Sequence, residues 1–375
     1  MDGGWTALAA RLGMRYPIIL APLAGGPSTP ALVAAVSAAG GLGSLGAAYL
    51  APEQIRDEIA RVRRLTDRPF AVNLFAGGAT GGADDTGPML ALLARWHRAL
   101  GLEPPTLAAP PADRFGEQLE AVLRGGPPAA FSFTFGIPDG GVMAELRRLG
   151  VFLMGTATTV DEARALEEAG VDAVVAQGSE AGGHRGTFRG SFEAGMVGTM
   201  ALVPQVADAV RVPVVASGGI MDGRGIVAAQ ALGAAAVQLG TAFLATDEAG
   251  TPAPYRARLL AAGEDATALT RAYSGRPARG IRTTFMDQVE REGIPIPPFP
   301  LQNALTRPLR TAAARAGESD ALSLWAGQGL RLLRTGSAAT LVQELATQSE
   351  RIRAGLRAGT ALGVGDDPAP AASHP

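Results

Sequence analysis

Eight short apolar runs, separated by segments of helical pattern, restrict the fold of this chain more than any other feature. Each run is rich in Val, Leu, Ile or Phe at both odd and even positions, and each ends in glycine, proline or a small polar residue. Strands without a polar face are typical of parallel sheets that helices cover on both sides. The runs span residues 16–21, 41–45, 70–75, 129–135, 151–155, 173–177, 212–217 and 235–239.

The segments between these runs carry helix signals. Thr29 followed by Pro30 is typical of a helix N-terminus, and residues 52–65 repeat apolar side chains at helical spacing. Eight alternations of strand and helix predict an α/β fold, a (β/α)8 TIM barrel. A doubly wound sheet is the alternative, because strand order cannot be read from the sequence.

The chain is long enough for a barrel with additions. We expect the cofactor-binding barrel to occupy residues 1–246. After the eighth run, helical pieces and a proline-rich segment predict a small helical lid subdomain at residues 247–334, over the barrel mouth. Residues 335–360 are expected to supply the last barrel helix, and residues 361–375 a disordered tail.

The composition excludes several classes of protein. The chain has 375 residues, no cysteine and a net charge of −2. It therefore has no disulfide, thiolate zinc site or thiol nucleophile, and no metal-ligand spacing of His with Asp or Glu is present. Without a basic stripe, a long apolar span or a signal-peptide pattern, neither nucleic acid nor membrane is an expected partner. We expect a cytoplasmic monomer or homodimer that acts on a small molecule.

One histidine stands in a plausible active-site setting. Of the three histidines, His97 lies in a helical stretch and His374 in the expected tail. His184 lies in a glycine-dense tract, residues 176–186, directly after an apolar run. Glycines let backbone approach a ligand closely, and an imidazole can exchange a proton near neutral pH. We therefore predict that His184 is catalytic.

Polar and glycine residues follow several predicted strands. In a barrel these positions meet at the C-terminal rim, where the active site forms. Glycines after the seventh and eighth strands suit a phosphate, and amides after the third and sixth suit the polar edge of a flavin, although each could serve only the fold. The turn after the first strand could offer backbone to the ring. These positions are Asn73, Gln177, Ser217-Gly218-Gly219, Gly240-Thr241 and Ala21-Pro22-Leu23.

A literal match to the dinucleotide fingerprint occurs at residues 41–46, Gly-Leu-Gly-Ser-Leu-Gly. The fingerprint should follow a strand and open a helix, whereas this segment follows a helix and contains a strand. We predict instead that its glycines end the helix and let the second strand pack closely.

The chain resembles class I nitronate monooxygenases, formerly called 2-nitropropane dioxygenases. The tract Glu180-Ala-Gly-Gly-His184 carries part of the resemblance, together with residues 18–30, 69–75, 155–159, 216–219, 238–241 and 274–280, in family order over most of the chain. The resemblance implies a barrel that binds FMN and oxidises alkyl nitronates with O₂ to carbonyl compounds and nitrite, a detoxification. Propionate 3-nitronate is the implied natural substrate.

The resemblance also implies roles for individual residues. His184 would be the active-site histidine, either holding the anionic nitronate or acting as base on a neutral nitroalkane. Phe299, in the lid, would cover the substrate. The residues implied to hold FMN are Asn73, Gln177, Gly182, Gly219, Gln238, Leu239, Gly240 and Thr241.

Other functions stay open at this point. An NAD(P)H-dependent FMN reductase of quinones or enoyl thioesters could share the barrel and its loops. A barrel similar to IMP dehydrogenase would need a catalytic cysteine, which is missing. A non-catalytic flavin-binding protein would leave the lid and His184 without a role.

Overall fold

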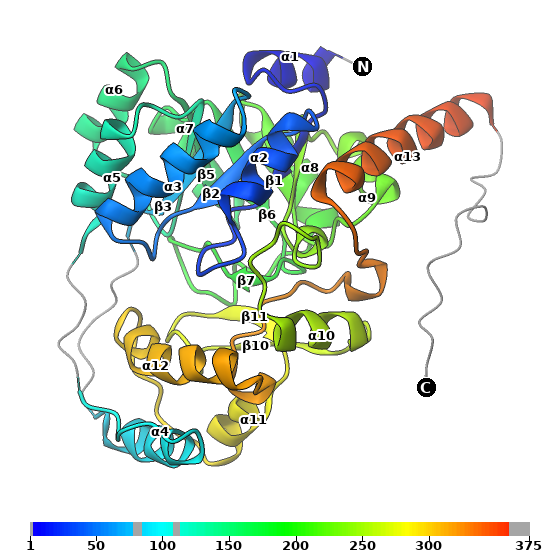
Figure 1. Ribbon diagram of the computed structural model, residues 1–375. Coiled ribbons are helices and arrows are strands. Elements are labelled where there is room, and N and C mark those ends of the chain that lie inside the picture. Colours follow the sequence, from blue (N-terminus) through cyan, green and yellow to red (C-terminus); the bar gives the residue numbers. More distant parts are fainter. Residues whose placement is uncertain (1–2, 78–84, 108–112, 360–375) are drawn as a thin grey trace.

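A computed structural model describes residues 3–77, 85–107 and 113–359. Figure 1 shows two lobes, a barrel ringed by helices and a smaller lobe below the C-terminal ends of its strands. The expected tail, residues 361–375, lies outside the described residues. Within them, no helix combines the length and the apolar character needed to cross a membrane.

The larger lobe is the predicted TIM barrel. Its sheet runs in the order β1-β9-β8-β6-β5-β4-β3-β2 with every pairing parallel, and a parallel bridge between Ile19 and Leu42 brings the two ends of the sheet together. The doubly wound alternative is wrong, since that sheet would stay open. The strands are β1 (Ile18–Leu20), β2 (Gly43–Gly46), β3 (Phe70–Phe75), β4 (Ala130–Thr134), β5 (Phe152–Ala157), β6 (Ala173–Gln177), β8 (Val214–Ser217) and β9 (Ala236–Leu239).

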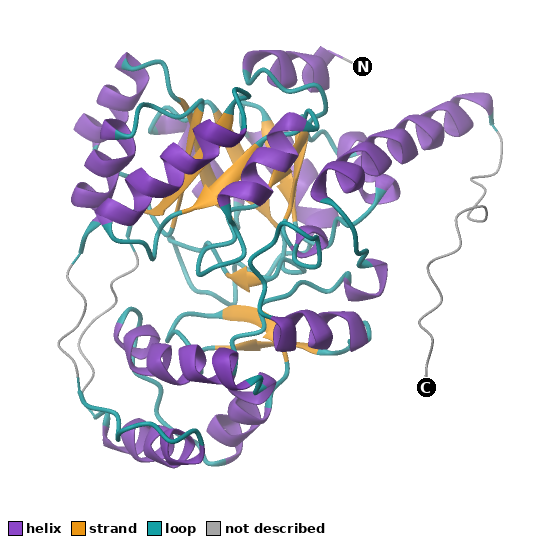
Figure 2. Ribbon diagram, viewed as in Figure 1, coloured by secondary structure: helices purple, strands orange, loops and turns teal. Residues whose placement is uncertain are grey.

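Helices cover the outside of the barrel (Figure 2). Thr29 caps the first of them as expected, accepting a hydrogen bond from the Leu32 amide at 3.0 Å. The expected last helix packs against α9 and α2. The barrel helices are α2 (Pro30–Ala38), α3 (Pro52–Leu65), α5 (Phe115–Arg124), α6 (Gly140–Arg148), α7 (Val160–Glu168), α8 (Thr199–Ala209), α9 (Gly223–Ala231) and α13 (Ala338–Ala358).

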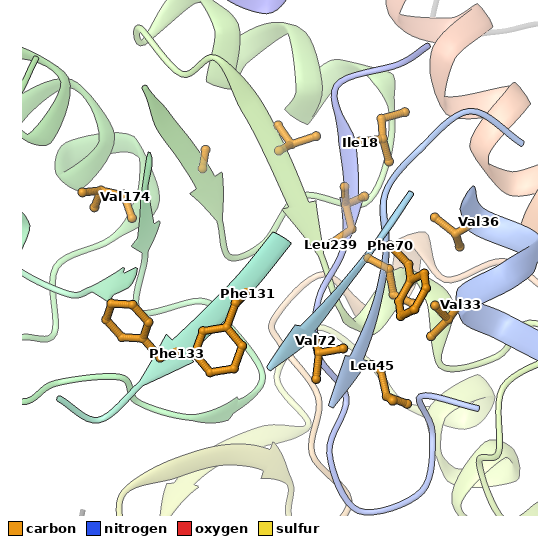
Figure 3. Close-up of a cluster of buried hydrophobic side chains, with 14 of the residues drawn as sticks. Ile18, Val33, Val36, Leu45, Phe70, Val72, Phe131, Phe133, Val174 and Leu239 are labelled. Atoms are coloured by element: carbon orange, nitrogen blue, oxygen red, sulfur yellow. The ribbon is translucent and has the colours of Figure 1, made fainter. Parts of the chain in front are cut away.

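Alternate residues of each strand belong to two layers of the core, one between sheet and helices and one inside the barrel. Residues such as Val72, Phe131 and Leu239 face the helices, where they pack with Val33 and other apolar side chains (Figure 3). The alternate residues point into the barrel. At the N-terminal end of the barrel these are apolar and pack against α1 (Gly3–Arg11), which supplies Leu8 and Leu12. At the C-terminal end, which faces the smaller lobe, the inward residues are polar and contribute to the site.

The glycines within residues 41–46 allow close packing of β2, as predicted. A Cβ at Gly43 would lie 2.0 Å from the Val33 carbonyl oxygen, and one at Gly46 would lie 2.5 Å from the Ala24 amide nitrogen. These glycines bring β2 into close contact with α2 and the turn after β1, so the dinucleotide reading of this segment has no structural basis.

The smaller lobe includes the helices of residues 247–334, the segment expected to form a lid, and two features that the sequence did not indicate. One is a three-stranded antiparallel sheet in the order β10-β11-β7, whose strand β7 comes from the histidine tract. The other is α4, from the crossover after β3. The lid elements are β7 (Gly183–His184), β10 (Thr267–Thr270), β11 (Ala278–Ile281), α4 (Gly87–Ala99), α10 (Ala253–Ala261), α11 (Thr284–Arg291) and α12 (Leu301–Ala316).

The position of α4 corrects the expected division of the chain, which assigned it to the barrel. Its Met89, Leu92 and Leu93 are fully buried in the apolar cluster of the lid. The Trp96 indole donates a hydrogen bond to Gln288 of α11 at 2.9 Å. An amphipathic pattern shows that a helix buries one face, but it does not show which surface covers that face. The sequence therefore could not show that α4 packs against the lid and not against the barrel.

Candidate active site

The histidine tract is held by both lobes. His184 pairs with Ala278 of β11, so the tract forms an edge strand of the lid sheet. From the barrel side, the Gln177 amide donates to the His184 carbonyl at 3.0 Å and accepts from the Gly186 amide at 2.8 Å. Glu180 accepts hydrogen bonds from Thr199 at the start of α8, which is the supporting role its place in the tract suggests. These bonds fix where the imidazole stands.

Ser274 orients the His184 ring. Nε2 of His184 lies 2.8 Å from the Ser274 hydroxyl, and that hydroxyl donates its hydrogen to the Arg276 carbonyl at 3.0 Å. With that hydrogen on the Arg276 carbonyl, the hydroxyl oxygen accepts from Nε2, and the proton of the neutral ring resides on Nε2. No described residue forms a hydrogen bond with Nδ1. Its lone pair is thus available to a ligand.

The surroundings of His184 keep the ring neutral. Burial, the largest cause, and the positive charges of Arg276 and Arg310 together lower the pKa of His184 to about 3. At neutral pH the imidazole is therefore uncharged. Positive charge at this site comes from the arginines instead.

Aromatic side chains enclose the imidazole. The ring centroids of Phe135, Phe299 and Trp325 lie 5.8, 6.3 and 5.4 Å from that of His184. Phe75, at the end of β3, lies 6.5 Å away. The structure therefore brings the predicted lid residue Phe299 to His184, with barrel and lid both supplying walls. Such an apolar enclosure strengthens electrostatic interactions inside it.

Sequence analysis missed Phe135 and Arg276 as members of this site. Phe135 has φ of 75°, a left-handed conformation that a non-glycine residue rarely adopts. The Arg276 guanidinium lies 3.8 Å from the centroid of its ring. Arg276 also bonds the Arg185 and Thr187 carbonyls, so it joins the lid to the segment after His184. The left-handed backbone of Phe135 cannot be read from the sequence. The Ser274-Gly-Arg276 run, in contrast, could have indicated that Arg276 belongs to the site.

Inward-facing polar residues line the C-terminal end of the barrel. Gln177, Ser217 and Gln238 are register partners on adjacent strands. Asn73 is buried and donates to the Ser132 hydroxyl at 2.9 Å, which uses one of its hydrogens for the fold. Leu239 has the opposite parity and faces the helices, so its side chain is not brought to this row. Its carbonyl accepts from Ala21 at 2.8 Å and fixes the turn after β1.

The glycines that follow β8 and β9 include two, Gly219 and Gly240, whose backbone amides have no hydrogen-bond partner among the described residues. Gly218 and Gly219 have φ of 120° and 69°, and a Cβ on Gly218 would lie 2.8 Å from the Thr199 hydroxyl. Among described residues, no acceptor faces the amide of Gly219 or Gly240. An orphaned amide pair after the last two barrel strands fits a phosphate. These residues therefore fit the phosphate of a flavin mononucleotide.

The segment Trp325 to Gly329 crosses the same rim and was not predicted. Its Gly327 amide donates to the Thr241 hydroxyl at 2.9 Å, and its Gln328 amide donates to the Glu180 carbonyl at 3.0 Å. A Cβ on Gly182 would lie 2.5 Å from the Ala326 carbonyl carbon. Gly182 and Thr241 thus contact this segment directly. Its Gly-Gln-Gly sequence, residues 327–329, is rich in glycine like the turns after the barrel strands, and this could have indicated a place at the rim.

Comparison with known proteins gives the family. The family model described as nitronate monooxygenase matches residues 7–348. A probable nitronate monooxygenase of Staphylococcus saprophyticus is 43% identical over 350 residues, which cover 92% of this chain and 98% of that protein.

Two solved structures share the fold. Nitroalkane oxidase from Streptomyces ansochromogenes is 45% identical with a TM-score of 0.83, over 93% of this chain and 99% of that one. FabK from Thermotoga maritima is 28% identical with a TM-score of 0.75, over 94% of this chain and 98% of that one. Fold, site and relatives define the class as a TIM-barrel oxidoreductase of the flavoenzyme kind. The chain belongs to the nitronate monooxygenase family.

Proposed function

We propose that this enzyme uses FMN and O₂ to oxidise alkyl nitronates to carbonyl compounds and nitrite, with propionate 3-nitronate as substrate. One observation carries the proposal: a neutral His184 stands in an aromatic enclosure beside the guanidinium of Arg276, and the positive charges of Arg276 and Arg310 both act on it. Neither arginine forms an ion pair within the described part of the chain. Glu162 offsets part of the Arg276 charge from beyond ion-pair distance, and the positive charge that is left suits an anionic substrate.

FMN is the proposed cofactor, and it would supply the site that accepts electrons from the substrate. The Gly219 and Gly240 amides would hold its phosphate, with Gly218 and Thr241 beside them. Inward-facing Asn73, Gln177 and Gln238 would serve the polar edge of the ring. The turn Ala21-Pro22-Leu23 would contribute backbone, as would Leu239, and Gly182 would keep the rim narrow.

The state of His184 favours a nitronate over a neutral nitroalkane. An imidazole whose pKa is about 3 is a weak base, poorly matched to removing a proton from carbon. A nitronate anion has no acidic hydrogen to give to Nδ1, so the arginines would hold its negative charge. His184 would form an uncharged wall of the substrate site, and Phe299 would exclude water above the substrate.

The decisive test compares electron donors. The purified protein is mixed with propionate 3-nitronate, or with NADH or NADPH, while O₂ uptake and nitrite are recorded and the flavin released by denaturation is identified. We expect FMN, with nitrite and O₂ uptake from the nitronate only. Rapid oxidation of NADH or NADPH without nitrite formation from the nitronate would instead favour a reductase of quinones or enoyl thioesters.

A further inference from the structure

A cavity of about 260 Å³ lies between the segment that follows His184 and the turn that joins β10 to β11. Arg185 lines it from the first segment, and Arg271 and Arg276 line it from the second. Among the described residues that form its walls, none is an Asp or a Glu. Arg271 is exposed, so solvent reaches the cavity. Three cationic residues and no acidic one therefore surround this space.

The fold leaves much of this positive charge uncompensated. None of the three arginines forms an ion pair within the described part of the chain. The Arg185 guanidinium donates to three backbone carbonyls, at 2.6, 3.0 and 2.7 Å, and Arg276 also donates to carbonyls only. Glu162 and Glu180 offset part of the charge of Arg185 from beyond ion-pair distance. Burial lowers the pKa of Arg185 and of Arg276 to about 10, so both stay charged at neutral pH.

Two of these guanidinium groups keep a donor without a partner. The Arg185 side chain is almost fully buried, and its Nε has no hydrogen-bond partner. Arg276 donates through Nε and Nη2, whereas its Nη1 bonds to no acceptor among the described residues. Buried donors are almost always satisfied in folded proteins. Unused donors on cations at a cavity therefore point to an anion that completes them.

The size and the walls of the cavity narrow the choice of anion. One water molecule takes about 30 Å³, so the cavity holds more than a single small ion. Pockets for drug-sized ligands begin at about 300 Å³, so the occupant is small. Guanidinium groups pair closely with phosphate oxygens, and a phosphate dianion can serve more than one of them. Phe192 and Pro277 add apolar wall beside the arginines, which suits a small organic group attached to the phosphate.

We propose that this cavity binds a small phosphate ester outside the catalytic enclosure, and that the bound ester opposes binding of an anionic substrate. Arg276 connects the two places. It lines the cavity, and its guanidinium lies 3.8 Å from the ring centroid of Phe135, which faces His184. An anion in the cavity takes up positive charge that the substrate would otherwise use, so each ligand weakens the other. This coupling, but not the site itself, rests on the proposed nitronate oxidation.

The first test measures binding without turnover. The FMN-loaded enzyme is titrated calorimetrically with phenyl phosphate and with inorganic phosphate, as the wild type, Arg271→Gln and Arg189→Gln. Arg189 is exposed in the same segment as Arg185 but does not line the cavity, so it is the matched control. We expect one phenyl phosphate per chain in the wild type and in Arg189→Gln, and about tenfold weaker binding in Arg271→Gln, since a charged partner is lost. Inorganic phosphate should bind the wild type more weakly than phenyl phosphate, because it has no ring to contact Phe192.

The affinities decide on the site and on its ligand. No binding of phenyl phosphate to the wild type at millimolar concentration, or equal binding to Arg271→Gln, would overturn the site. Equal affinity of the wild type for the two phosphates would overturn the ester as the ligand and leave inorganic phosphate in its place. Because the titration needs no turnover, these outcomes hold even if no nitronate is oxidised.

Steady-state kinetics test the coupling. Phenyl phosphate that half-saturates the wild type or more should raise the KM for propionate 3-nitronate about fivefold in the wild type and in Arg189→Gln. At the same concentration, KM should change little in Arg271→Gln, where the cavity is mostly empty. A rise of the same size in Arg271→Gln would place the ester in the catalytic enclosure and contradict the proposal. An unchanged KM in the wild type would show that Arg276 does not link the two places.

Discussion

The side-chain amide of Gln177 holds the backbone on both sides of Arg185, donating to the His184 carbonyl at 3.0 Å and accepting from the Gly186 amide at 2.8 Å. Gln177 ends β6, and His184 lies in the lid sheet. One residue of the barrel therefore sets the place of the histidine relative to the strand ends. The sequence left open whether Gln177 serves a flavin or the fold, and these two hydrogen bonds show that it serves the fold.

We expect Gln177→Leu to lower kcat about tenfold and the free energy of unfolding by about 1–3 kcal/mol, since two buried backbone groups lose their partner. Steady-state nitrite assays and denaturant unfolding would measure both. Gln205→Leu is the control, because Gln205 is exposed and bonds only within α8. A Gln177 variant as active and stable as this control would show that the lid sheet alone places His184.

Ser274→Ala should release the His184 ring from its tautomer. With the hydroxyl gone, Nε2 loses the acceptor at 2.8 Å, and the hydrogen can reside on either ring nitrogen. We expect kcat to fall about tenfold. The FMN content should not change, because the Ser274 hydroxyl contacts the His184 imidazole and not the glycine turns proposed to hold the phosphate.

The tautomer of His184 can be measured directly by nitrogen NMR of the labelled imidazole, which an activity assay cannot do. The wild type should show a single tautomer protonated at Nε2, and Ser274→Ala a mixture. Ser319→Ala, in the η2 turn (Ser319–Ala321) of the lid, is the control. A single unchanged tautomer in Ser274→Ala would mean that burial, not Ser274, fixes the proton.

The barrel and the position of His184 could be predicted because both follow from local patterns. Each of the eight predicted runs overlaps a barrel strand, and parallel strands bring their ends together whatever lies between them. The contacts between lid and barrel could not be predicted in the same way. Phe135, Phe299 and Trp325 surround His184 only because segments distant in the chain pack against each other. No local pattern records such contacts.

Stability should depend on pH through His184. Its pKa is about 3 in the folded protein and about 6.5 in the unfolded chain. As the pH falls below 6.5, the unfolded chain binds a proton that the folded state refuses, so the free energy of unfolding falls, by at most about 1.4 kcal/mol per pH unit. This contribution is fully present above pH 6.5.

We therefore expect His184→Asn to have a shallower loss of stability than the wild type between pH 6.5 and pH 4. Urea unfolding at several pH values would measure it. Nitronate turnover should be impaired in this variant while FMN stays bound. Parallel stability curves for the two proteins would show that the folded protein accepts the proton readily, and would remove the argument for a neutral imidazole.

The last prediction concerns the glycines that match the dinucleotide fingerprint. Gly43→Ala should destabilise the protein by about 1–3 kcal/mol, because its Cβ would lie 2.0 Å from the Val33 carbonyl oxygen and would push α2 away from β2. Gly116→Ala is the matched control: Gly116 lies in α5 with open space around it, so the change should stabilise by about 0.5–1 kcal/mol. FMN affinity should be the same in both variants. If Gly43→Ala instead weakened flavin binding and left stability unchanged, β2 would have a place in the cofactor site.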